Sequence, residues 1–259
     1  MSGDSVILRT ENVGKTFGAF CALHKISVAI PHGRLTAIIG PNGAGKSTLF
    51  NVISGALPPT EGRIFFEGRE ITGASQHALA RMGIAKSYQI TNIFPNLSVI
   101  ENVRVAAQAL VSRFEIWRPR AMLTEPLREA ENLLEFVGLG GRARLLAANL
   151  SHGEQRSLEI AIALAGKPRL LLLDEPTAGM SPEETRVMME LIVKLARERT
   201  VVLVEHKMKL VMNISDHVIV LHHGEVLAEG NPDEIRANEV VRRVYLGQAQ
   251  PHAARRSDV

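Results

Sequence analysis

The chain has 259 residues, of which 46% are hydrophobic and 22% charged, and it carries a formal net charge of +3. This length and apolar content support one large domain or two small ones with a buried core, and they exclude intrinsic disorder for most of the chain. The charge is too small for a nucleic-acid-binding protein, and no dense block of Lys and Arg accompanies it. A single cysteine, Cys21, excludes an internal disulfide framework and a multi-cysteine zinc site.

No apolar run approaches the 18 or more residues that a membrane-spanning helix needs, so another chain is expected to cross any membrane at which this protein works. Residues 1–8 lack the charged and then apolar pattern of a secretory signal. These two patterns predict neither a spanning nor a secreted chain.

Apolar runs bounded by turn residues alternate with helix-like stretches, which predicts an α/β protein. In the first third of the chain, the pattern predicts a turn at residues 14–16 and a helix that begins near Lys46 and ends before Gly55. The expected strands span residues 6–8, 26–30, 35–39, 62–66 and 85–88.

The middle of the chain, residues 91–149, changes character. Ser98 and Glu101 have the spacing of a helix capping box, and apolar residues follow them at helical spacing. A second helix is expected at residues 127–137. We therefore expect a mostly helical subdomain at 91–149, inserted into an α/β core that is made of residues 5–90 and 150–246.

The last part opens with a continuous apolar run at residues 170–173, which is typical of a buried parallel strand. Ser181, Pro182 and Glu184 have the spacing of an N-cap, a first-turn proline and a capping-box acid, so a helix is expected there. Further strands are expected at 200–204 and 218–221. A terminal helix should run from Asn231 to about residue 246, and a flexible tail should follow at 247–259.

Residues 40–47 match the phosphate-binding pattern G-x-x-x-x-G-K-[ST] at every fixed position, between a predicted strand and a predicted helix. Gly43 and Gly45 let the backbone curl until its N–H groups face phosphate oxygens, and the helix N-terminus adds partial positive charge. Lys46 would place its ammonium on the β- and γ-phosphates, and the Ser47 hydroxyl would contact Mg²⁺. The nucleotide-binding residues predicted in this segment are Gly40, Pro41, Asn42, Gly43, Ala44, Gly45, Lys46, Ser47 and Thr48.

Two carboxylates, Asp174 and Glu175, follow the apolar run at residues 170–173. In an open α/β sheet, ligands gather at the carboxyl ends of the parallel strands, where these two side chains would lie. Asp174 is the predicted metal-side carboxylate, and Glu175 is placed to orient or deprotonate the attacking water. Together with the phosphate loop, these residues predict a nucleoside triphosphatase.

Residues 149–156, Asn-Leu-Ser-His-Gly-Glu-Gln-Arg, resemble the L-S-G-G-Q signature of ATP-binding cassette (ABC) ATPases. Other marks follow in the family's order: Gln89 resembles the Q-loop glutamine, residues 178–182 the D-loop, and His206 the switch histidine. Phe17 stands at the usual place of the aromatic residue that stacks on adenine. The resemblance covers about residues 5–246 and implies the P-loop fold of an ABC ATPase, with a mixed sheet core and an inserted helical subdomain.

The resemblance also implies the cofactors ATP and Mg²⁺ and a set of site residues. Roles in catalysis are implied for Lys46, Gln89, Glu175 and His206, and contact with Mg²⁺ for Ser47, Gln89 and Asp174. Further contacts to the nucleotide are implied for Phe17, Ser151, Gly153 and Glu154. The sequence departs from the family pattern at His152 and Glu154 of the signature and at Ser181 of the D-loop, where many relatives have Asp. Ser151 and Glu154 also have the spacing of a capping box.

The family pattern implies a nucleotide-driven dimer, in which the signature of one subunit closes over ATP held by another. A single cassette without spanning helices resembles the detached subunit of a prokaryotic importer, peripheral on the cytoplasmic face of the inner membrane. The implied partners are a second cassette (this chain again or a paralogue), two membrane permeases and, indirectly, a solute-binding protein, but no nucleic acid.

The segments at 174–180, 204–208 and 244–247 resemble those of importers for branched-chain amino acids. Importers of urea, amides and aromatic acids share much of this sequence pattern, so the pattern does not identify the transported solute. The alternative functions are an ABC ATPase for assembly, of the iron–sulfur cluster type, and a motor that extracts lipid or lipopolysaccharide.

Overall fold

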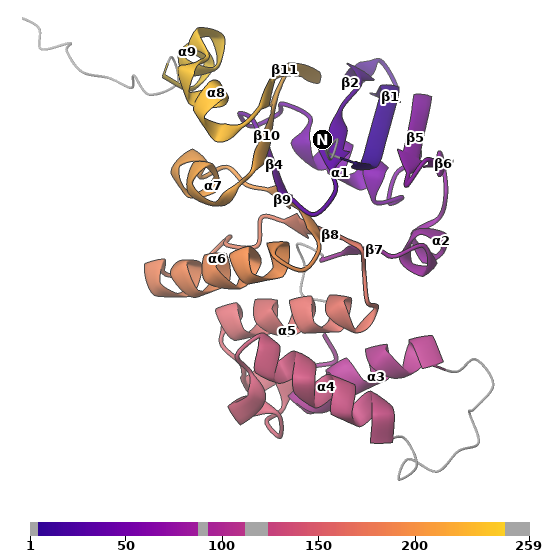
Figure 1. Ribbon diagram of the computed structural model, residues 1–259, viewed down its shortest axis with the longest axis vertical. Helices are drawn as coiled ribbons and strands as arrows, with labels where there is room; N and C mark the ends of the chain where they lie inside the picture. Colours follow the sequence, from indigo (N-terminus) through magenta and orange to yellow (C-terminus); the bar gives the residue numbers. More distant parts are fainter. Residues whose placement is uncertain (1–4, 88–92, 112–123, 247–259) are drawn as a thin grey trace, which may run out of the picture.

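The computed structural model describes residues 5–87, 93–111 and 124–246. Two β-sheets lie together at one end of the molecule. The helices α3 (Val99–Val111) and α4 (Thr124–Phe136) lie at the other end, beyond α5 (His152–Ala165) (Figure 1). Within the described residues, the predicted phosphate loop, Asp174, Glu175 and His206 follow strands at the sheet end, whereas the predicted signature lies at the start of α5.

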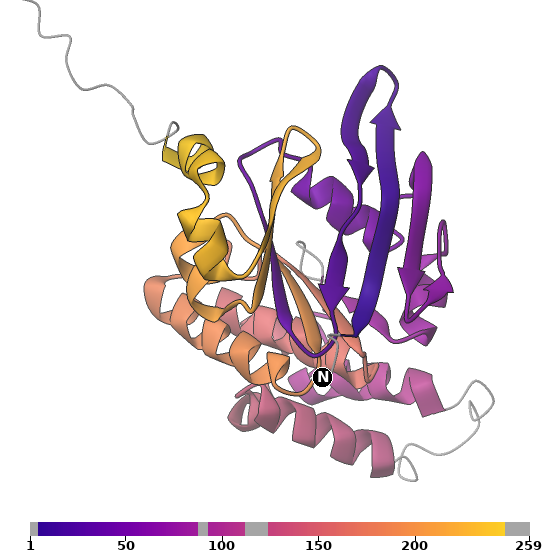
Figure 2. The same cartoon turned by 45° about the horizontal axis from the view of Figure 1, so that its top comes forward.

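An antiparallel sheet is built from the first seventy residues. Its strands follow the order β2-β1-β5-β6, and β3 also pairs with β1. Figure 2 shows the hairpin of β1 and β2 rising from this sheet. The bounds are β1 (Val6–Phe17), β2 (Phe20–Ile26), β3 (Ala29–Pro31), β5 (Glu61–Phe66) and β6 (Arg69–Glu70).

Two predictions for this sheet are wrong. Residues 14–16 do not form a turn but lie inside β1, because register shifts opposite β2 and β5 absorb the irregular residues. The strand expected at 26–30 is split, since β2 ends at Ile26 and β3 begins at Ala29. The buried Thr10 hydroxyl accounts for the split: it donates to the Ile26 carbonyl and accepts from the Val28 N–H, both at 3.0 Å, in place of backbone ladder bonds.

The second sheet follows the order β11-β10-β4-β9-β8-β7 and is parallel except for β11, which pairs antiparallel with β10. Strand β11 was not predicted, because its residues are only partly buried and form no apolar run. The carboxyl ends of β4, β7, β8 and β9 share one edge of this sheet. The bounds are β4 (Leu35–Ile39), β7 (Ile84–Lys86), β8 (Leu170–Asp174), β9 (Thr200–Val204), β10 (His217–His222) and β11 (Glu225–Gly230).

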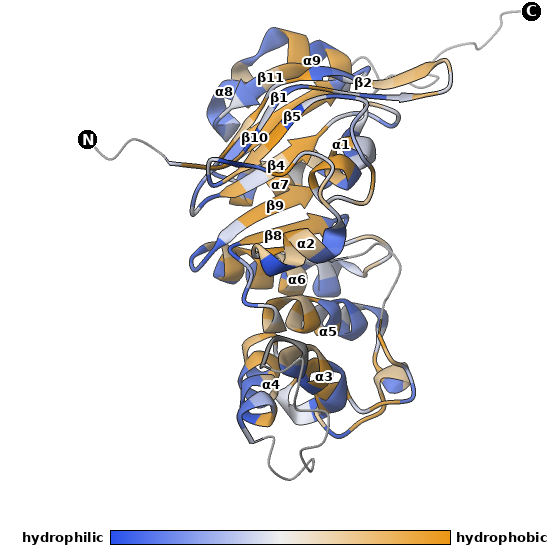
Figure 3. Ribbon diagram, turned by 90° about the vertical axis from the view of Figure 1, so that its right-hand side faces the viewer, coloured by the Kyte–Doolittle hydropathy of each residue, from blue (hydrophilic) through white to orange (hydrophobic). Residues whose placement is uncertain are grey.

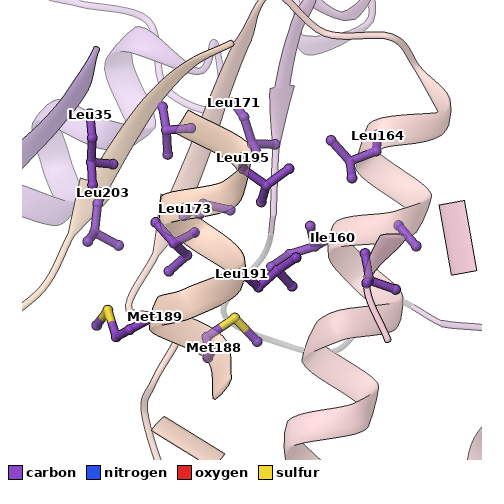
Figure 4. Packing of buried hydrophobic residues seen from close by; sticks show 14 of the residues in the cluster. Leu35, Ile160, Leu164, Leu171, Leu173, Met188, Met189, Leu191, Leu195 and Leu203 are labelled. Atoms are coloured by element: carbon purple, nitrogen blue, oxygen red, sulfur yellow. The ribbon is translucent and has the colours of Figure 1, made fainter. Parts of the chain in front are cut away.

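The central strands of this sheet contribute to two hydrophobic cores. In β8, Leu171 and Leu173 pack with the helices on one face, whereas Leu170 and Leu172 belong to the core on the side of α1 and the antiparallel sheet. Figure 4 shows the first core, in which these strand residues meet Leu195 of α6. Because successive side chains alternate between two buried faces, the strands are apolar at almost every position, as the colouring of Figure 3 shows.

Helices pack on both faces of the parallel strands, with α1 on one face and α3–α6 on the other. The bounds are α1 (Lys46–Ile53), α2 (Gln76–Arg81), α3 (Val99–Val111), α4 (Thr124–Phe136), α5 (His152–Ala165), α6 (Pro182–Ala196), α7 (Met208–Ile214), α8 (Pro232–Ala237) and α9 (Glu239–Leu246), with short 3₁₀ turns at Gly140–Arg142 and Ala147–Asn149. None of the described helices is both long and apolar enough to cross a membrane.

The single terminal helix expected from Asn231 is in fact two helices, α8 and α9. Asn238 interrupts the helix in an extended conformation, and its Oδ1 accepts hydrogen bonds from the N–H groups of Val240 (2.9 Å) and Val241 (3.1 Å). This side chain therefore ends one helix and caps the next.

Helices α3 and α4 pack on each other and on α5. Their buried residues Val99, Val103 and Leu134 join the same core as Leu158 of α5 and the strands of the parallel sheet. The Ser98 hydroxyl accepts from the Glu101 N–H at 3.3 Å, as the predicted cap requires. The division of the chain at residues 91 and 149 stays a prediction.

Candidate functional site

The predicted phosphate loop joins β4 to α1. Lys46, the first residue of α1, is only 7% exposed, and its Nζ donates to the carbonyls of Gly40 (2.8 Å) and Pro41 (2.9 Å). The ammonium therefore lies folded back across the loop. Burial lowers the pKa of Lys46, while the nearby carboxylates of Glu175 and Asp174 oppose that shift.

The start of α1 is suited to an anion. Its N-cap residue, Gly45, has a φ of 99° and no side chain to cap the helix, and the first turn contains no acidic residue. A Cβ at Gly45 would lie 2.9 Å from the carbonyl oxygen of Ala22 in β2, so this position requires glycine. The N–H groups of the first turn and the positive end of the helix dipole can therefore act on a phosphate.

The two predicted carboxylates lie at the carboxyl end of β8, which is separated from β4 by β9. Asp174 is its last residue and is 7% exposed. Glu175 has a positive φ of 44°, and its N–H donates to the carbonyl of Val204 in β9 at 2.9 Å. This left-handed conformation turns the chain sharply after Asp174, and such strain in a residue other than glycine is typical of functional sites.

A second lysine, Lys86 at the carboxyl end of β7, completes the charge cluster. Its Nζ donates to Asn51 Oδ1 of α1 at 2.6 Å and lies 4.9 Å from the centre of the Phe50 ring. Burial raises the pKa of Asp174, and the lysines Lys86 and Lys46 oppose this rise. Burial lowers the pKa of Lys86, and Asp174 opposes that shift. Lys86 was not among the predicted site residues, because its charge matters only once β7 is placed beside β8.

His206 and Glu205 follow β9 at the same edge of the sheet. The side chain of His206 is 49% exposed, whereas that of Glu205 is fully buried. Glu205 Oε1 accepts from the hydroxyl and the N–H of Thr177, which lies two residues after Glu175. Neither Glu205 nor Thr177 was among the predicted site residues, because their pairing joins residues that are far apart in the chain.

The signature residues lie at the start of α5. Ser151 caps this helix by accepting from the Glu154 N–H at 3.2 Å, and Glu154 accepts from the Ser151 N–H at 2.9 Å, so the predicted capping box is confirmed. The N–H of Gly153 and the hydroxyl of Ser151 both donate to Glu184 Oε1 of α6, at 3.2 and 3.3 Å. His152 Nε2 lies 3.1 Å from the carbonyl oxygen of Ala178. The departure from the family pattern at His152 thus provides a contact between the signature and the D-loop of the same chain.

Of the residues predicted for the adenine side and the Q-loop, only Phe17 lies within the described part of the chain. Phe17 ends β1 with 46% of its surface exposed, and Lys15 Nζ lies 5.2 Å from its ring centre. Its hairpin partner β2 contacts the phosphate loop through Ala22. Gln89 lies outside the described residues.

The residues at the ends of β4 and β8 offer oxygen ligands of the kind that Mg²⁺ prefers. Asp174 contributes a carboxylate, and Ser47 contributes an exposed hydroxyl in the first turn of α1. Within the described part of the chain, no three His, Cys, Asp or Glu side chains are grouped as a metal cage. A nucleotide-bound Mg²⁺ is usually held by one or two protein groups together with phosphates and waters, so this donor set fits the ion.

Comparison with known sequences gives two family matches. A model of the ABC transporter family matches residues 23–178, and a model of the branched-chain amino acid ATP-binding cassette transporter matches residues 225–250. The chain is 39% identical to the high-affinity branched-chain amino acid transport ATP-binding protein BraF of Pseudomonas aeruginosa, over 94% of this chain and 98% of that protein. It is 40% identical, with the same coverage, to the corresponding protein LivG of Salmonella typhimurium.

Solved structures agree with these matches. The crystal structure of an ABC transporter cassette in its ADP conformation superposes with a TM-score of 0.82 at 32% identity, over 94% of this chain and 99% of that one. A dimeric cassette in a post-hydrolysis state, bound to ADP and Pi, gives a TM-score of 0.73 at 28% identity, over 87% and 98% of the two chains. The predicted fold class and the family resemblance are confirmed.

Proposed function

Because this chain belongs to the ABC transporter family, we propose that it is the ATP-hydrolysing subunit of a prokaryotic importer for branched-chain amino acids or a related small solute. The observation that carries the proposal is the arrangement at one sheet edge, where the phosphate loop, the pair Asp174–Glu175 and His206 leave the adjacent strands β4, β8 and β9. The family match at residues 225–250 supports an importer over an assembly ATPase or a lipid-extraction motor.

The first step is binding of the ATP phosphates at the start of α1. Phosphate oxygens would take the place of the Gly40 and Pro41 carbonyls as acceptors for Lys46, and this exchange converts two neutral acceptors into charged ones. Phe17, exposed at the end of β1, would stack on the adenine. The remaining loop residues would hold the phosphates through backbone N–H groups.

Hydrolysis would then proceed on the carboxylate side of the site. Ser47 and Asp174 would hold Mg²⁺, with Gln89 contributing from the Q-loop, and the ion would supply charge neutralisation for the phosphates. Glu175 would orient the attacking water and accept its proton, and His206 would contact the γ-phosphate. The position of Glu175 supports this role, because it follows Asp174 directly at the carboxyl end of β8 and its N–H is held by the carbonyl of Val204 in β9.

The signature would act on the ATP of a second subunit. Ser151 and Gly153 offer a hydroxyl and an N–H at the start of α5, and in this chain both donate to Glu184. A γ-phosphate of a partner cassette would exchange with this carboxylate. The partner would be a second copy or a paralogue, and the pair would work on the cytoplasmic face of the inner membrane.

A groove on the cassette suits a segment of a permease. The groove has a volume of about 430 Å³ and lies between α2, β7, α3 and α5; its lining includes His77, Arg81, Lys86, Ala106 and Ala163. Because Lys86 also belongs to the charge cluster beside Asp174, the groove adjoins the nucleotide site. We propose that a permease segment docks in this groove, which α3 of the inserted helical region borders on one side, and that a solute-binding protein delivers the solute to that permease.

Glu175→Gln provides the test of this function. The change keeps the side chain's shape and removes its basicity, so ATP binding should survive, hydrolysis should nearly stop, and an ATP-bound dimer should accumulate. Size-exclusion chromatography with ATP and Mg²⁺ would be run on the chain alone and then with its companion cassette. Glu198→Gln is the matched control, because Glu198 is exposed beside the amino end of β9, at the opposite edge of the sheet.

Only monomers in both cases, or undiminished hydrolysis by Glu175→Gln, would contradict the assignment. The solute is tested separately, by uptake of labelled leucine into vesicles that contain the cassette and its permeases. Uptake of urea or an aromatic acid in place of leucine would move the protein to another importer class and leave the ATPase assignment intact.

A further inference from the structure

Glu205 is a fully buried carboxylate at the carboxyl end of β9, immediately before His206. Its Oε1 accepts the Thr177 hydroxyl at 2.5 Å and the Thr177 N–H at 3.3 Å. Its Oε2 accepts the His206 N–H at 3.2 Å and lies 3.7 Å from His206 Nδ1. One side chain therefore contacts both the switch histidine and the segment that follows Glu175.

That segment leads from the catalytic carboxylates to the D-loop. Thr177 is itself fully buried, and the next residue, Ala178, contacts His152 of the signature through its carbonyl oxygen. The exits of β8 and β9 are also joined by the hydrogen bond from the Glu175 N–H to the Val204 carbonyl. Glu205 thus connects His206 to Thr177, and the residue after Thr177, Ala178, contacts His152 at the start of α5.

The chemistry of the position requires a carboxylate. Donors approach both of its oxygens, so the side chain must accept on both sides. A glutamine can accept on only one side, because its NH₂ would face either the Thr177 donors or the His206 N–H. Burial without those hydrogen bonds would be costly, and an apolar residue would satisfy none of the three donors.

We infer that Glu205 is a positioning residue for ATP hydrolysis, which fixes His206 relative to residues 175–178. The histidine then reaches the γ-phosphate only when the D-loop segment is in place, so hydrolysis depends on the D-loop as well as on the bound nucleotide. This inference rests on the proposed function, in which His206 contacts the γ-phosphate.

Glu205→Gln should lower kcat for ATP hydrolysis by about 100-fold, because a displacement of the order of 1 Å at a reacting group can have that effect. ATP affinity, measured with a fluorescent ATP analogue, should change by about threefold or less, since the phosphate loop is untouched. The decisive readout is a double-mutant cycle with His206→Ala. If Glu205 acts through His206, adding Glu205→Gln to that background should lower kcat by about twofold or less.

Thr177→Val gives an independent version of the test, since it removes the hydroxyl and keeps the N–H donor. It should lower kcat by a smaller factor than Glu205→Gln and should also show little effect in the His206→Ala background. Thr36→Val is its matched control, because Thr36 is a fully buried threonine of β4 whose hydroxyl has no hydrogen-bond partner in the described structure. Thr177→Val also decides the question if Glu205→Gln does not fold.

Three outcomes would overturn the inference. The first is an unchanged kcat in folded Glu205→Gln, or in Thr177→Val if the former does not fold. The second is a full additional loss in the His206→Ala background, which would indicate a role independent of the histidine. The third, an unchanged rate in His206→Ala itself, would contradict the proposed role of His206 in the site and the inference with it. A slow His206→Ala with a normal Glu205→Gln would contradict the inference alone.

Discussion

Nucleotide binding is expected to depend most directly on Lys46, because its ammonium already lies across the predicted phosphate loop. We expect Lys46→Ala to weaken ATP binding strongly and to lower hydrolysis by about 100-fold or more, since loss of one preorganised donor has effects of that order. Titration with a fluorescent ATP analogue and release of phosphate measure the two effects. Lys194→Ala is the control, because Lys194 donates to the Phe136 carbonyl, outside the site. Wild-type turnover in Lys46→Ala would refute the role.

Site residues could be predicted from sequence where their chemistry is local. The phosphate loop and the pair Asp174–Glu175 each follow a recognisable strand, so pattern and position agree. The contact of Glu205 with Thr177 was not predictable, because it joins two residues 28 positions apart through the parallel pairing of β8 and β9. Lys86 was missed for a similar reason: its charge matters only once β7 is placed beside β8.

At the scale of elements, the start of α6 joins the D-loop to the signature through Glu184. Hydrogen bonds from the Ser181 N–H and hydroxyl, and then from the Gly153 N–H, lower the pKa of Glu184. A lowered carboxyl pKa contributes stability above the ordinary value of about 4.3, and that contribution is lost as the pH falls through the folded-state pKa.

We therefore expect Glu184→Gln to lower the melting temperature at pH 7 and to converge with the wild type as the pH is lowered below about 4.3. Thermal melts across this range provide the measurement. Glu131→Gln, at an exposed position of α4, is the control and should track the wild type throughout. A gap between Glu184→Gln and the wild type that stays constant with pH would show that the hydrogen bonds to the ionised carboxylate are not its cause.

The groove between α2, β7, α3 and α5 gives the docking proposal a specific surface. We expect Arg81→Glu, which reverses a charge on the groove wall, to reduce co-purification with the permease subunits and to leave ATP binding unchanged. Arg242→Glu reverses an exposed charge on α9, which lies outside both the groove and the inserted helical region, and should have no such effect. Permease association that survives Arg81→Glu and other charge changes in the groove would remove this surface from consideration.

Strands that are buried on both faces were easier to predict from the sequence than partly buried or short elements. Strands β4 and β9 were predicted at their observed bounds because both faces of each strand are buried, which produces an unbroken apolar run. Strand β11 is only partly buried and helix α2 is short, so neither has a clear period. The split between β2 and β3 depends on the Thr10 hydroxyl, which belongs to another strand.

At the scale of the whole molecule, one parallel sheet holds two cores together. The alternating side chains of β4, β8 and β9 contribute apolar residues to both cores. The antiparallel sheet and the helices α3–α6 therefore pack, on opposite faces, against the same strands that carry the site. The motifs at the carboxyl edge of that sheet are therefore anchored from both faces. This arrangement explains how loops of little regular structure can hold charged groups at fixed positions.

The phosphate loop and the signature begin different helices, α1 and α5, so a dimer assembled from two copies would exchange complementary halves. Genetics can detect that exchange. A copy with Lys46→Ala has an intact signature, and a copy with Ser151→Arg has an intact phosphate loop. In a mixed dimer, one site contains both substitutions, and the other site combines the intact phosphate loop with the intact signature. The two variants should therefore hydrolyse ATP when they are co-expressed, although neither does so alone. If the natural partner is a paralogue, this complementation in trans should be absent, and either lesion should be recessive to a wild-type copy.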